Sequence, residues 1–296
     1  MHLPLSRAIA PHLHLLDEVG STNAELVARA SSGEAQDFTV VVTTNQTAGR
    51  GRLDRVWVAP PGRTIAVSVL LSLPDLPLEK VGWMPLLAGL AMTRAVASLV
   101  DPPRISLKWP NDVQVDGLKV SGLLTELLVS PRAVVIGAGL NLTMTAEELP
   151  TPAATSLTLV GADATDIVDR ALAAYLGELR QLSDAYRGSG FDPEAGLRDQ
   201  VVRVCGTIGQ QVRVELPDGS MLRGVAEGID SVGRLQVRDD AVRQIMHIDD
   251  DAPDPRFLDP VERMVDQRLA RHAHQRLGAG RGQRAHTLAQ PRRHQH

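Results

Sequence analysis

A loop of alternating glycines and arginines is the first segment whose residue types could do chemistry. Residues 45–57 read NQTAGRGRLDRVW, so Gly49 and Gly51 alternate with Arg50 and Arg52. Guanidinium groups form charge-assisted hydrogen bonds with anions, and glycines let backbone N–H groups approach a ligand closely. The loop is therefore suited to binding an anion, although for such a loop alone a solvated basic turn is the commoner explanation.

The stretch from Lys108 to Leu128, KWPNDVQVDGLKVSGLLTELL, carries two of the three lysines in a chain that otherwise uses arginine. A lysine ammonium is compact and approaches one oxygen, whereas a guanidinium forks across two. The Asp116-Gly117 pair is typical of a two-residue hairpin turn. Lys119 follows this turn, on a strand expected to run back past Asn111-Asp112. A solvated hairpin lysine is the alternative interpretation.

These cations and amides together predict a site that joins two anions. Bringing a carboxylate against the α-phosphate of a nucleotide costs on the order of 4 kcal/mol per unit-charge pair at a surface-like dielectric. Arg50, Lys119 and a magnesium ion near Asn111 and Asp112 would offset that cost. Such a clamp catalyses phosphoryl-type transfer by positioning and by stabilising charge.

Hydrophobic periodicity predicts the elements that must position these groups. Apolar and β-branched runs indicate strands, and longer amphipathic or apolar runs indicate helices. The expected strands span residues 38–44, 63–73, 104–109 and 132–142, with a hairpin over 113–128. The expected helices span residues 22–32, 78–100 and 163–186, the second beginning in earnest near Pro85. The binding segments would then meet at one rim of a sheet.

Two local signals refine these boundaries. Thr22 and Glu25 have capping-box spacing, which predicts the start of the first helix. Small polar side chains at such a helix mouth could also bind a polar ligand group. Pro110 is expected to stop strand pairing and to force Asn111 and Asp112 out at the strand end.

The strand over residues 132–142 carries Gly137 and Gly139 at alternate positions, which leaves one face without side chains. Such a pattern indicates either a bulge or a place where a ligand lies against bare backbone. We favour the ligand, because the neighbouring motifs require a floor.

The chain is expected to have three regions. Residues 1–190 form the main domain, residues 199–250 form a small β-barrel of SH3 size, and residues 252–296 form a disordered tail. Residues 253–296 contain nine arginines and five of the nine histidines against four acidic residues. A nucleic-acid arm or a metal-binding tract is the alternative for this tail, but it lacks aromatic platforms and regular ligand spacing.

Composition excludes several classes of protein. The chain has 296 residues, 43% of them hydrophobic, and a net charge of −4, which argues against a nucleic-acid or anionic-membrane surface on the folded part. One cysteine excludes an intramolecular disulfide and a cysteine-based metal cluster. Arg7, histidines and prolines interrupt the amino-terminal apolar run, so we expect no signal peptide, no membrane span and a cytoplasmic location.

Together the motifs resemble those of biotin protein ligases in order and approximate spacing. They are Ser21-Thr22-Asn23, Gln46–Arg52 (QTAGRGR), Lys108–Asp112 (KWPND), Lys119–Gly122 (KVSG) and Gly137–Asn141 (GAGLN). The resemblance covers about residues 15 to 250 and includes Gly224–Asp230 in the second domain. It implies an α+β fold like that of class II synthetases, with a mixed, mainly antiparallel sheet and flanking helices, plus a small SH3-like β-barrel.

The resemblance implies a two-step reaction. Biotin and MgATP give biotinyl-5′-adenylate and pyrophosphate, and a lysine of a biotin carboxyl carrier domain then attacks the adenylate and releases AMP. The implied catalytic residues are Lys119, Arg50 and Asp112, with Lys119 touching both the carboxylate and the α-phosphate, and Asp112 orienting the incoming amine.

The same resemblance assigns the binding residues. The implied biotin-binding residues are Ser21, Thr22, Asn23, Gln46, Gly49, Arg50, Gly51, Lys119, Gly122, Gly137 and Gly139. The implied ATP and adenylate ligands are Arg50, Arg52, Arg55, Trp57 over the adenine, Asn111, Lys119 and Asn141. Asn111 and Asp112 are the implied magnesium ligands.

Two departures from the family pattern stand out. Leu53-Asp54 replace the Arg-Gly that often follows the second arginine, so the carboxylate of Asp54 should weaken or reshape phosphate binding unless it points away or pairs with Arg52 or Arg55. We expect the loop to order only around the adenylate. The roughly 15 residues before Ser21 are too few for a helix-turn-helix, which predicts a ligase-only form without specific DNA binding.

Other functions stay open. A lipoate or octanoate ligase or transferase of the same superfamily is the nearest alternative, and a non-catalytic binding or regulatory module is another. A homodimer formed through an edge strand near the glycine run is a further hypothesis that nothing in the sequence requires.

Overall fold

A computed structural model describes residues 1–52, 55–101, 105–130, 132–215, 220–239 and 245–248. Residues 1–253 form one compact unit, which contains all the described residues. The predicted tail over 252–296 and the Leu53-Asp54 departure lie outside the described residues. The predicted boundary between residues 190 and 199 stays a prediction.

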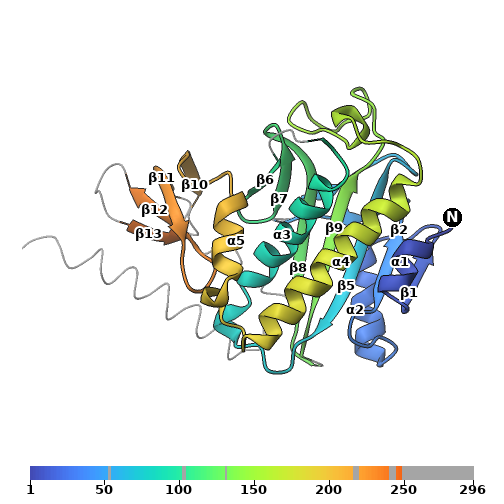
Figure 1. Cartoon of the computed structure of the whole chain (residues 1–296), viewed down its shortest axis with the longest axis horizontal. Helices are drawn as coiled ribbons and strands as arrows, with labels where there is room; N and C mark the ends of the chain where they lie inside the picture. Colours follow the sequence, from blue (N-terminus) through green and yellow to red (C-terminus); the bar gives the residue numbers. More distant parts are fainter. Residues whose placement is uncertain (53–54, 102–104, 131, 216–219, 240–244, 249–296) are drawn as a thin grey trace, which may run out of the picture. The chain divides into compact units, whose positions relative to one another are not determined.

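A seven-stranded sheet forms the centre of the main domain (Figure 1). Its strands, in spatial order, are β1 (Leu13–Leu16), β2 (Val40–Thr43), β5 (Thr64–Ser72), β9 (Ala133–Asn141), β8 (Leu118–Leu128), β7 (Asp112–Val115) and β6 (Ile105–Lys108). Only β1 and β2 pair in parallel, so the predicted mixed, mainly antiparallel sheet is confirmed. Because β9 is paired on both sides, the glycine run offers no free edge for a dimer. The edges of this sheet are β1 and β6.

Helices cover both faces of this sheet. The α-helices are α1 (Pro4–Ile9), α2 (Thr22–Ser32), α3 (Trp83–Ala97), α4 (Ile167–Gly188) and α5 (Leu197–Val204). Short 3-10 helices are η1 (Leu78–Lys80), η2 (Thr158–Val160) and η3 (Pro193–Ala195). Among the helices of the described part of the chain, none is long and apolar enough to cross a membrane.

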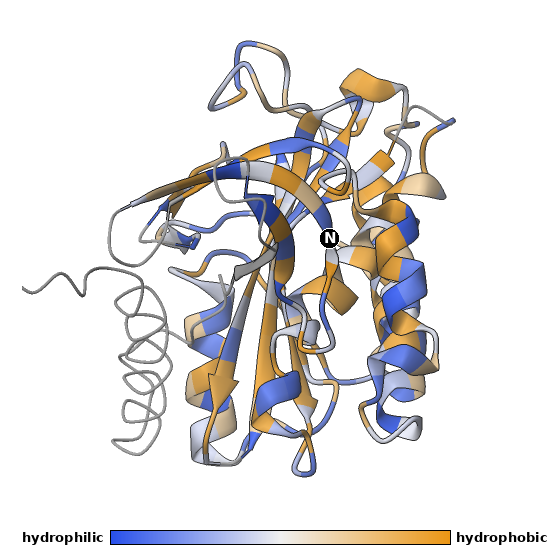
Figure 2. Cartoon of the chain, turned by 90° about the vertical axis from the view of Figure 1, so that its left-hand side faces the viewer, coloured by the Kyte–Doolittle hydropathy of each residue, from blue (hydrophilic) through white to orange (hydrophobic). Residues whose placement is uncertain are grey.

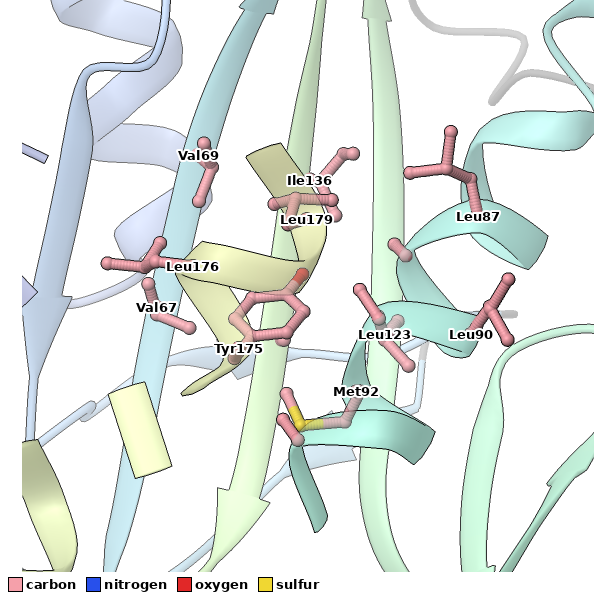
Figure 3. Close-up of a cluster of buried hydrophobic side chains, with 14 of the residues drawn as sticks. Val67, Val69, Leu87, Leu90, Met92, Leu123, Ile136, Tyr175, Leu176 and Leu179 are labelled. Carbon is pink, nitrogen blue, oxygen red and sulfur yellow. The ribbon is translucent and has the colours of Figure 1, made fainter. Parts of the chain in front are cut away.

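The main core lies between the sheet and the pair α3 and α4 (Figure 3). Alternate residues of β5, among them Val67 and Val69, pack with Ile136 of β9 and Leu176 of α4. In Figure 2 the central strands are largely orange, whereas the flanking helices carry blue segments as well. This is the pattern expected for strands covered by amphipathic helices.

The opposite face of the sheet packs against α2 through a smaller cluster. Leu26 and Ala30 of α2 contact Val41, Leu70 and Val135. Because side chains alternate along a strand, the residues of β5 and β9 that share this face include Ala66, Ser68, Gly137 and Gly139. The α2 face therefore passes from an apolar patch to a run of small residues.

Several predicted boundaries agree with the structure, and two do not. Pro85 lies in the first turn of α3, as predicted. The start of α2 at Thr22 is as predicted, but the cap is Ser21, whose hydroxyl accepts from Ala24 N, so Thr22 and Glu25 do not form the expected capping box. The hydroxyl of Thr22 instead forms hydrogen bonds with Gln46 and Ser68.

The second discrepancy concerns the type of element at the predicted start of the small β domain, near Asp199. Residues 197–204 form α5, because Leu197 and Val201 lie one helical turn apart and both are buried. The first strand of the small domain begins only at Gln211.

The small domain is a four-stranded antiparallel sheet in the described residues. Its strands are β10 (Gln211–Glu215), β11 (Met221–Ile229), β12 (Leu235–Asp239) and β13 (Ile245–Ile248), in that spatial order. Trp109 joins it to the main domain, since its backbone N–H donates to Thr207 Oγ1 at 2.9 Å and its indole N–H to Gly233 O at 3.2 Å. The small sheet is thus attached beside the KWPND motif.

Candidate active site

A cavity of about 360 Å³ opens on the α2 face of the large sheet. This volume falls within the range of small-molecule pockets, about 300–1,000 Å³. All predicted site residues except Gly49 line it, namely Ser21, Thr22, Asn23, Gln46, Arg50, Gly51, Arg52, Arg55, Trp57, Asn111, Asp112, Lys119, Gly122, Gly137, Gly139 and Asn141. The structure therefore brings together motifs that lie far apart in the sequence, while their roles in binding stay predictions.

A row of small residues across adjacent strands forms the floor of the cavity. Ala66 of β5 pairs with Gly139 of β9, Gly139 with Gly122 of β8, and Gly122 with Asp112 of β7. Three neighbouring strands thus present almost no side chain along one line, which ends at a carboxylate. The sequence motifs include the two glycines of this row but not Ala66.

Lys119 reaches this floor because of an irregularity in strand pairing. Val113 pairs with Ser121 but Gln114 with Lys119, which leaves Val120 as one extra residue in β8. Such a bulge re-aims side chains, so Lys119 lies on the same face as Gly122, three positions later. A Cβ on Gly122 would lie 2.9 Å from Lys119 Nζ. The absence of a side chain at Gly122 therefore leaves room for the ammonium group of Lys119.

The ammonium of Lys119 lies beside an acid and an aromatic ring. Its Nζ is 2.6 Å from Asp112 Oδ1 and 5.9 Å from the centroid of Trp57. The backbone of Lys119 also pairs with residues 153–155. Lys119 N donates to Ala153 O and Thr155 N donates to Lys119 O, each at 2.8 Å. The predicted hairpin and the position of Lys119 after its turn are confirmed.

Asn141 has a structural contact in this arrangement. Its side chain is buried, and Nδ2 donates to Thr155 O at 2.8 Å. This bond holds the segment that pairs with Lys119. Its predicted contact with the adenylate stays a prediction.

The prediction that Pro110 forces Asn111 and Asp112 out of the sheet is only partly right. Asp112 begins β7 and pairs with Lys108, so Trp109, Pro110 and Asn111 form a tight turn between paired strands. Asn111 Nδ2 donates to Leu123 O at 2.6 Å, which ties the turn to β8.

Side chains of the protein lie over both glycines of β9. Asn23 lies so close to Gly137 that any Cβ there would overlap its amide, and a Cβ on Gly139 would lie 2.5 Å from Cε2 and Cζ2 of Trp57. The bare backbone predicted for a ligand thus also accommodates these two side chains.

The mouth of α2 is built by a hydrogen-bond network that includes a residue the sequence analysis missed. Gln46 Oε1 accepts from Thr22 N at 2.9 Å and from Thr22 Oγ1 at 3.2 Å. Ser68 Oγ lies 2.8 Å from Thr22 Oγ1 and 2.5 Å from Asn23 Oδ1. The one available signal was a serine within the otherwise apolar core of β5, TIAVSVLL.

The glycine–arginine loop forms a small hairpin over the pocket. β3 (Gly49–Arg50) pairs antiparallel with β4 (Val56–Trp57), and Gly51 N donates to Arg55 O at 2.7 Å. A Cβ on Gly49 would lie 2.5 Å from Trp57 O, so Gly49 allows the strands to approach rather than lining the cavity. Whether this loop orders around an adenylate stays a prediction.

Glu126 is a second residue that the sequence analysis did not identify. Its Oε1 accepts from Arg50 Nη2 at 2.8 Å and from Asn23 Nδ2 at 2.7 Å. It lies on the pocket face of β8, in register with Val135. No motif in the sequence distinguishes this glutamate from a solvent-exposed one, because its partners come from two distant segments.

Comparison with known proteins places the chain in a family. Residues 16–141 match the Biotin/lipoate A/B protein ligase family, and residues 207–247 match the Biotin protein ligase C terminal domain. The chain is 42% identical over 225 residues to the biotin–acetyl-CoA-carboxylase ligase of Mycobacterium tuberculosis, covering 75% of this chain and 82% of the relative. The enzyme of that name from Paracoccus denitrificans is 31% identical over 245 residues, covering 78% and 96%.

Solved structures agree with this assignment. The biotin protein ligase from Aquifex aeolicus in complex with biotin and ATP is 26% identical, with a TM-score of 0.63 over 80% of this chain and 95% of that one. The ligase from Leishmania major in complex with biotin is 27% identical, with a TM-score of 0.55 over 81% and 98%. The resemblance of the motifs is thus confirmed, and the chain belongs to the biotin protein ligase family.

Proposed function

We propose that this chain is an ATP-dependent biotin protein ligase. Biotin and MgATP form biotinyl-5′-adenylate and pyrophosphate, and a lysine of a biotin carboxyl carrier domain then takes the biotinyl group and releases AMP. The names of the relatives from Mycobacterium tuberculosis and Paracoccus denitrificans support this proposal, as does the Aquifex aeolicus ligase solved with biotin and ATP.

The position of Lys119 is the observation that carries the proposal. Its ammonium stands at the end of the small-residue floor, 2.6 Å from Asp112. A substrate carboxylate lying along Gly139 and Gly122 would meet this ammonium, which would also stabilise charge on the α-phosphate as the new bond forms. The ion pair with Asp112 holds the ammonium in place before either substrate arrives.

The hairpin arginines supply the second kind of cation. Arg50, Arg52 and Arg55 line the same cavity and can form charge-assisted hydrogen bonds with phosphate oxygens. Trp57 now lies over Gly139. For Trp57 to cover the adenine while biotin occupies the floor, the β3–β4 hairpin must shift, which agrees with a loop that closes around the adenylate.

Magnesium fits the site only together with the nucleotide. Mg²⁺ is commonly held by one or two carboxylates and substrate phosphates, and Asp112 and Asn111 offer one carboxylate and one amide. Within the described part of the chain, no group of three or more His, Cys, Asp or Glu side chains could hold a metal alone. When bound, the ion would neutralise charge on the phosphates.

The partner in the second step would be the carrier domain of a biotin-dependent carboxylase. Asp112 would orient the incoming amine after Lys119 has engaged the phosphate. A chain with one cysteine in 296 residues suits a reducing compartment, and we place the enzyme in the cytoplasm. Dimerisation remains a hypothesis.

Biotin-dependent ATP–pyrophosphate exchange tests the proposal. We expect the purified full chain to exchange labelled pyrophosphate into ATP when biotin is present and to show background exchange with octanoate or lipoate. Exchange driven by octanoate or lipoate and not by biotin would instead assign the chain to the lipoate branch of the superfamily. No exchange with any of the three acids would favour a transferase that does not use ATP, or a non-catalytic module.

A further inference from the structure

Glu126 is an acid next to the pocket that plays no part in the proposed reaction. Its side chain is 10% exposed, and one oxygen, Oε1, accepts hydrogen bonds from both Asn23 and Arg50. These two residues come from the start of α2 and from β3. Glu126 is therefore the point at which the biotin side of the pocket meets the anion-binding hairpin.

Asn23 is a rigid partner in this arrangement. It is 4% exposed, and its amide contacts Ser68 Oγ through Oδ1 and both Leu124 O and Glu126 through Nδ2. With its side chain held by β5 and β8 at once, Asn23 fixes where the carboxylate of Glu126 lies. The carboxylate in turn fixes Arg50.

Charge makes the contact with Arg50 more than a surface ion pair. An exposed ion pair contributes little, because water competes for both partners. Here the carboxylate is largely shielded from water, so removing the guanidinium would leave a nearly buried charge with a neutral amide for compensation. Arg50 is thus held, although a guanidinium has five N–H donors and this contact uses only one of its nitrogens.

We propose that Glu126 is a positioning residue that holds Arg50 against Asn23. The remaining donors of Arg50 are then presented to the anions of the substrates, the biotin carboxylate and the phosphates. This inference rests on the proposed function. Glu126 does not itself contact substrate in this account, because a carboxylate would repel the biotin carboxylate and the phosphates. It acts through Arg50, and it links the hairpin to the floor of the pocket.

Glu126→Gln is the first test variant. Glutamine keeps the length of the side chain and an oxygen for Asn23 Nδ2 but removes the charge that holds Arg50. We expect the Kd for biotin, measured by calorimetry, to rise about tenfold, which corresponds to ~1.4 kcal/mol, with the melting temperature nearly unchanged. Glu178→Gln is the matched control, because Glu178 pairs with Arg94 at 3.2 Å between α4 and α3, away from the pocket. It should leave the Kd unchanged.

A double-mutant cycle tests whether Glu126 acts through Arg50. In an Arg50→Gln background, Glu126→Gln should raise the biotin Kd by less than about twofold, because its partner is already gone. A tenfold effect that persists in that background would overturn the inference, since Glu126 would then act independently of Arg50. A Glu126→Gln variant with the biotin Kd of the unmodified chain would overturn it as well.

The exchange assay separates this inference from the proposed function. If the unmodified chain shows biotin-dependent exchange and Glu126→Gln matches it in biotin KM and kcat, only the role of Glu126 fails. If the unmodified chain neither binds biotin nor shows biotin-dependent exchange, the proposed function fails and the inference fails with it.

Discussion

The large sheet has one face that packs against α3 and α4, the helix face, and one that lines the cavity, the pocket face. Both are built from the same strands but from residues of different size. Toward α3 and α4, β5 and β9 present branched apolar side chains such as Val67, Val69 and Ile136 (Figure 3). On the other face, beyond the apolar patch under α2, the same strands present alanine, serine and glycine, and the polar groups come from α2 and the hairpin. One face contributes packed volume, and the other leaves space and fixes hydrogen-bonding groups around it.

The comparison teaches that stability and binding are separable in this sheet. Interior packing is dense, so a lost methylene on the helix face leaves a cavity. On the pocket face an added methyl group is the harmful change, because side chains already lie against the glycines. Substitutions of opposite kind should therefore damage the two faces, and they should do so in different measurements.

Leu176→Ala is the largest expected loss on the helix face. Leu176 of α4 is fully buried among β-strand and helix side chains, and truncating a buried leucine typically costs about 2–5 kcal/mol. Denaturant unfolding should show this decrease, whereas the biotin Kd of the folded variant should not change. A raised biotin Kd at full folding would break the proposed separation of the faces.

Gly139→Ala is the corresponding change on the pocket face. The new methyl group would lie 2.5 Å from the Trp57 ring, and overpacking of this kind costs about 1–3 kcal/mol unless Trp57 moves. We expect a smaller loss of stability than for Leu176→Ala, and a raised KM for biotin in the exchange assay.

Gly177→Ala is the matched control for that substitution. Gly177 lies inside α4, where a Cβ would meet Ile9 Cδ1 at an ordinary 3.7 Å. The same glycine-to-alanine change should there stabilise the protein by about 0.5–1 kcal/mol, because alanine favours the helix. Equal effects of the two substitutions on biotin KM would count against the account.

Tyr175→Phe is the smallest expected effect. The hydroxyl of Tyr175 lies among apolar side chains in Figure 3, and no described residue forms a hydrogen bond with it. Its burial raises the pKa of the phenol. Because a buried hydroxyl without a partner is unfavourable, phenylalanine should leave stability unchanged or raise it by up to about 1 kcal/mol. A decrease in stability of more than about 1 kcal/mol would contradict this and would indicate a buried water bound to the hydroxyl.

Much of the scaffold was predictable because it follows from periodicity and turn chemistry. The apolar runs gave the central strands, and Asp116-Gly117 gave the hairpin, where both residues adopt positive φ angles of 49° and 81°. The buried residues of α4 follow a helical spacing. The glycine motifs also indicated the floor of the pocket, because each glycine in a strand marks a position without a side chain.

The remaining features depend on contacts between distant segments. The first turn of α1 has its N–H groups satisfied by Asp169, since Leu5 N and Ser6 N both donate to its carboxylate at 2.9 Å, so the residues near Leu5 alone do not predict this helix. Glu126 and Ser68 acquire their roles only when α2 is folded onto the sheet. The bulge at Val120 likewise arises from strand pairing rather than from residue type.

The most direct test of the central claim is the exchange activity of Lys119→Arg. Its charge is kept, but a guanidinium fork cannot occupy the point that the ammonium holds beside Asp112 and over Gly122. Biotin-dependent ATP–pyrophosphate exchange should fall by about 100-fold or more, as when a preorganised catalytic donor is lost, while the melting temperature stays within a few degrees. Exchange at the rate of the unmodified chain would show that Lys119 is a solvated hairpin lysine and would contradict the account.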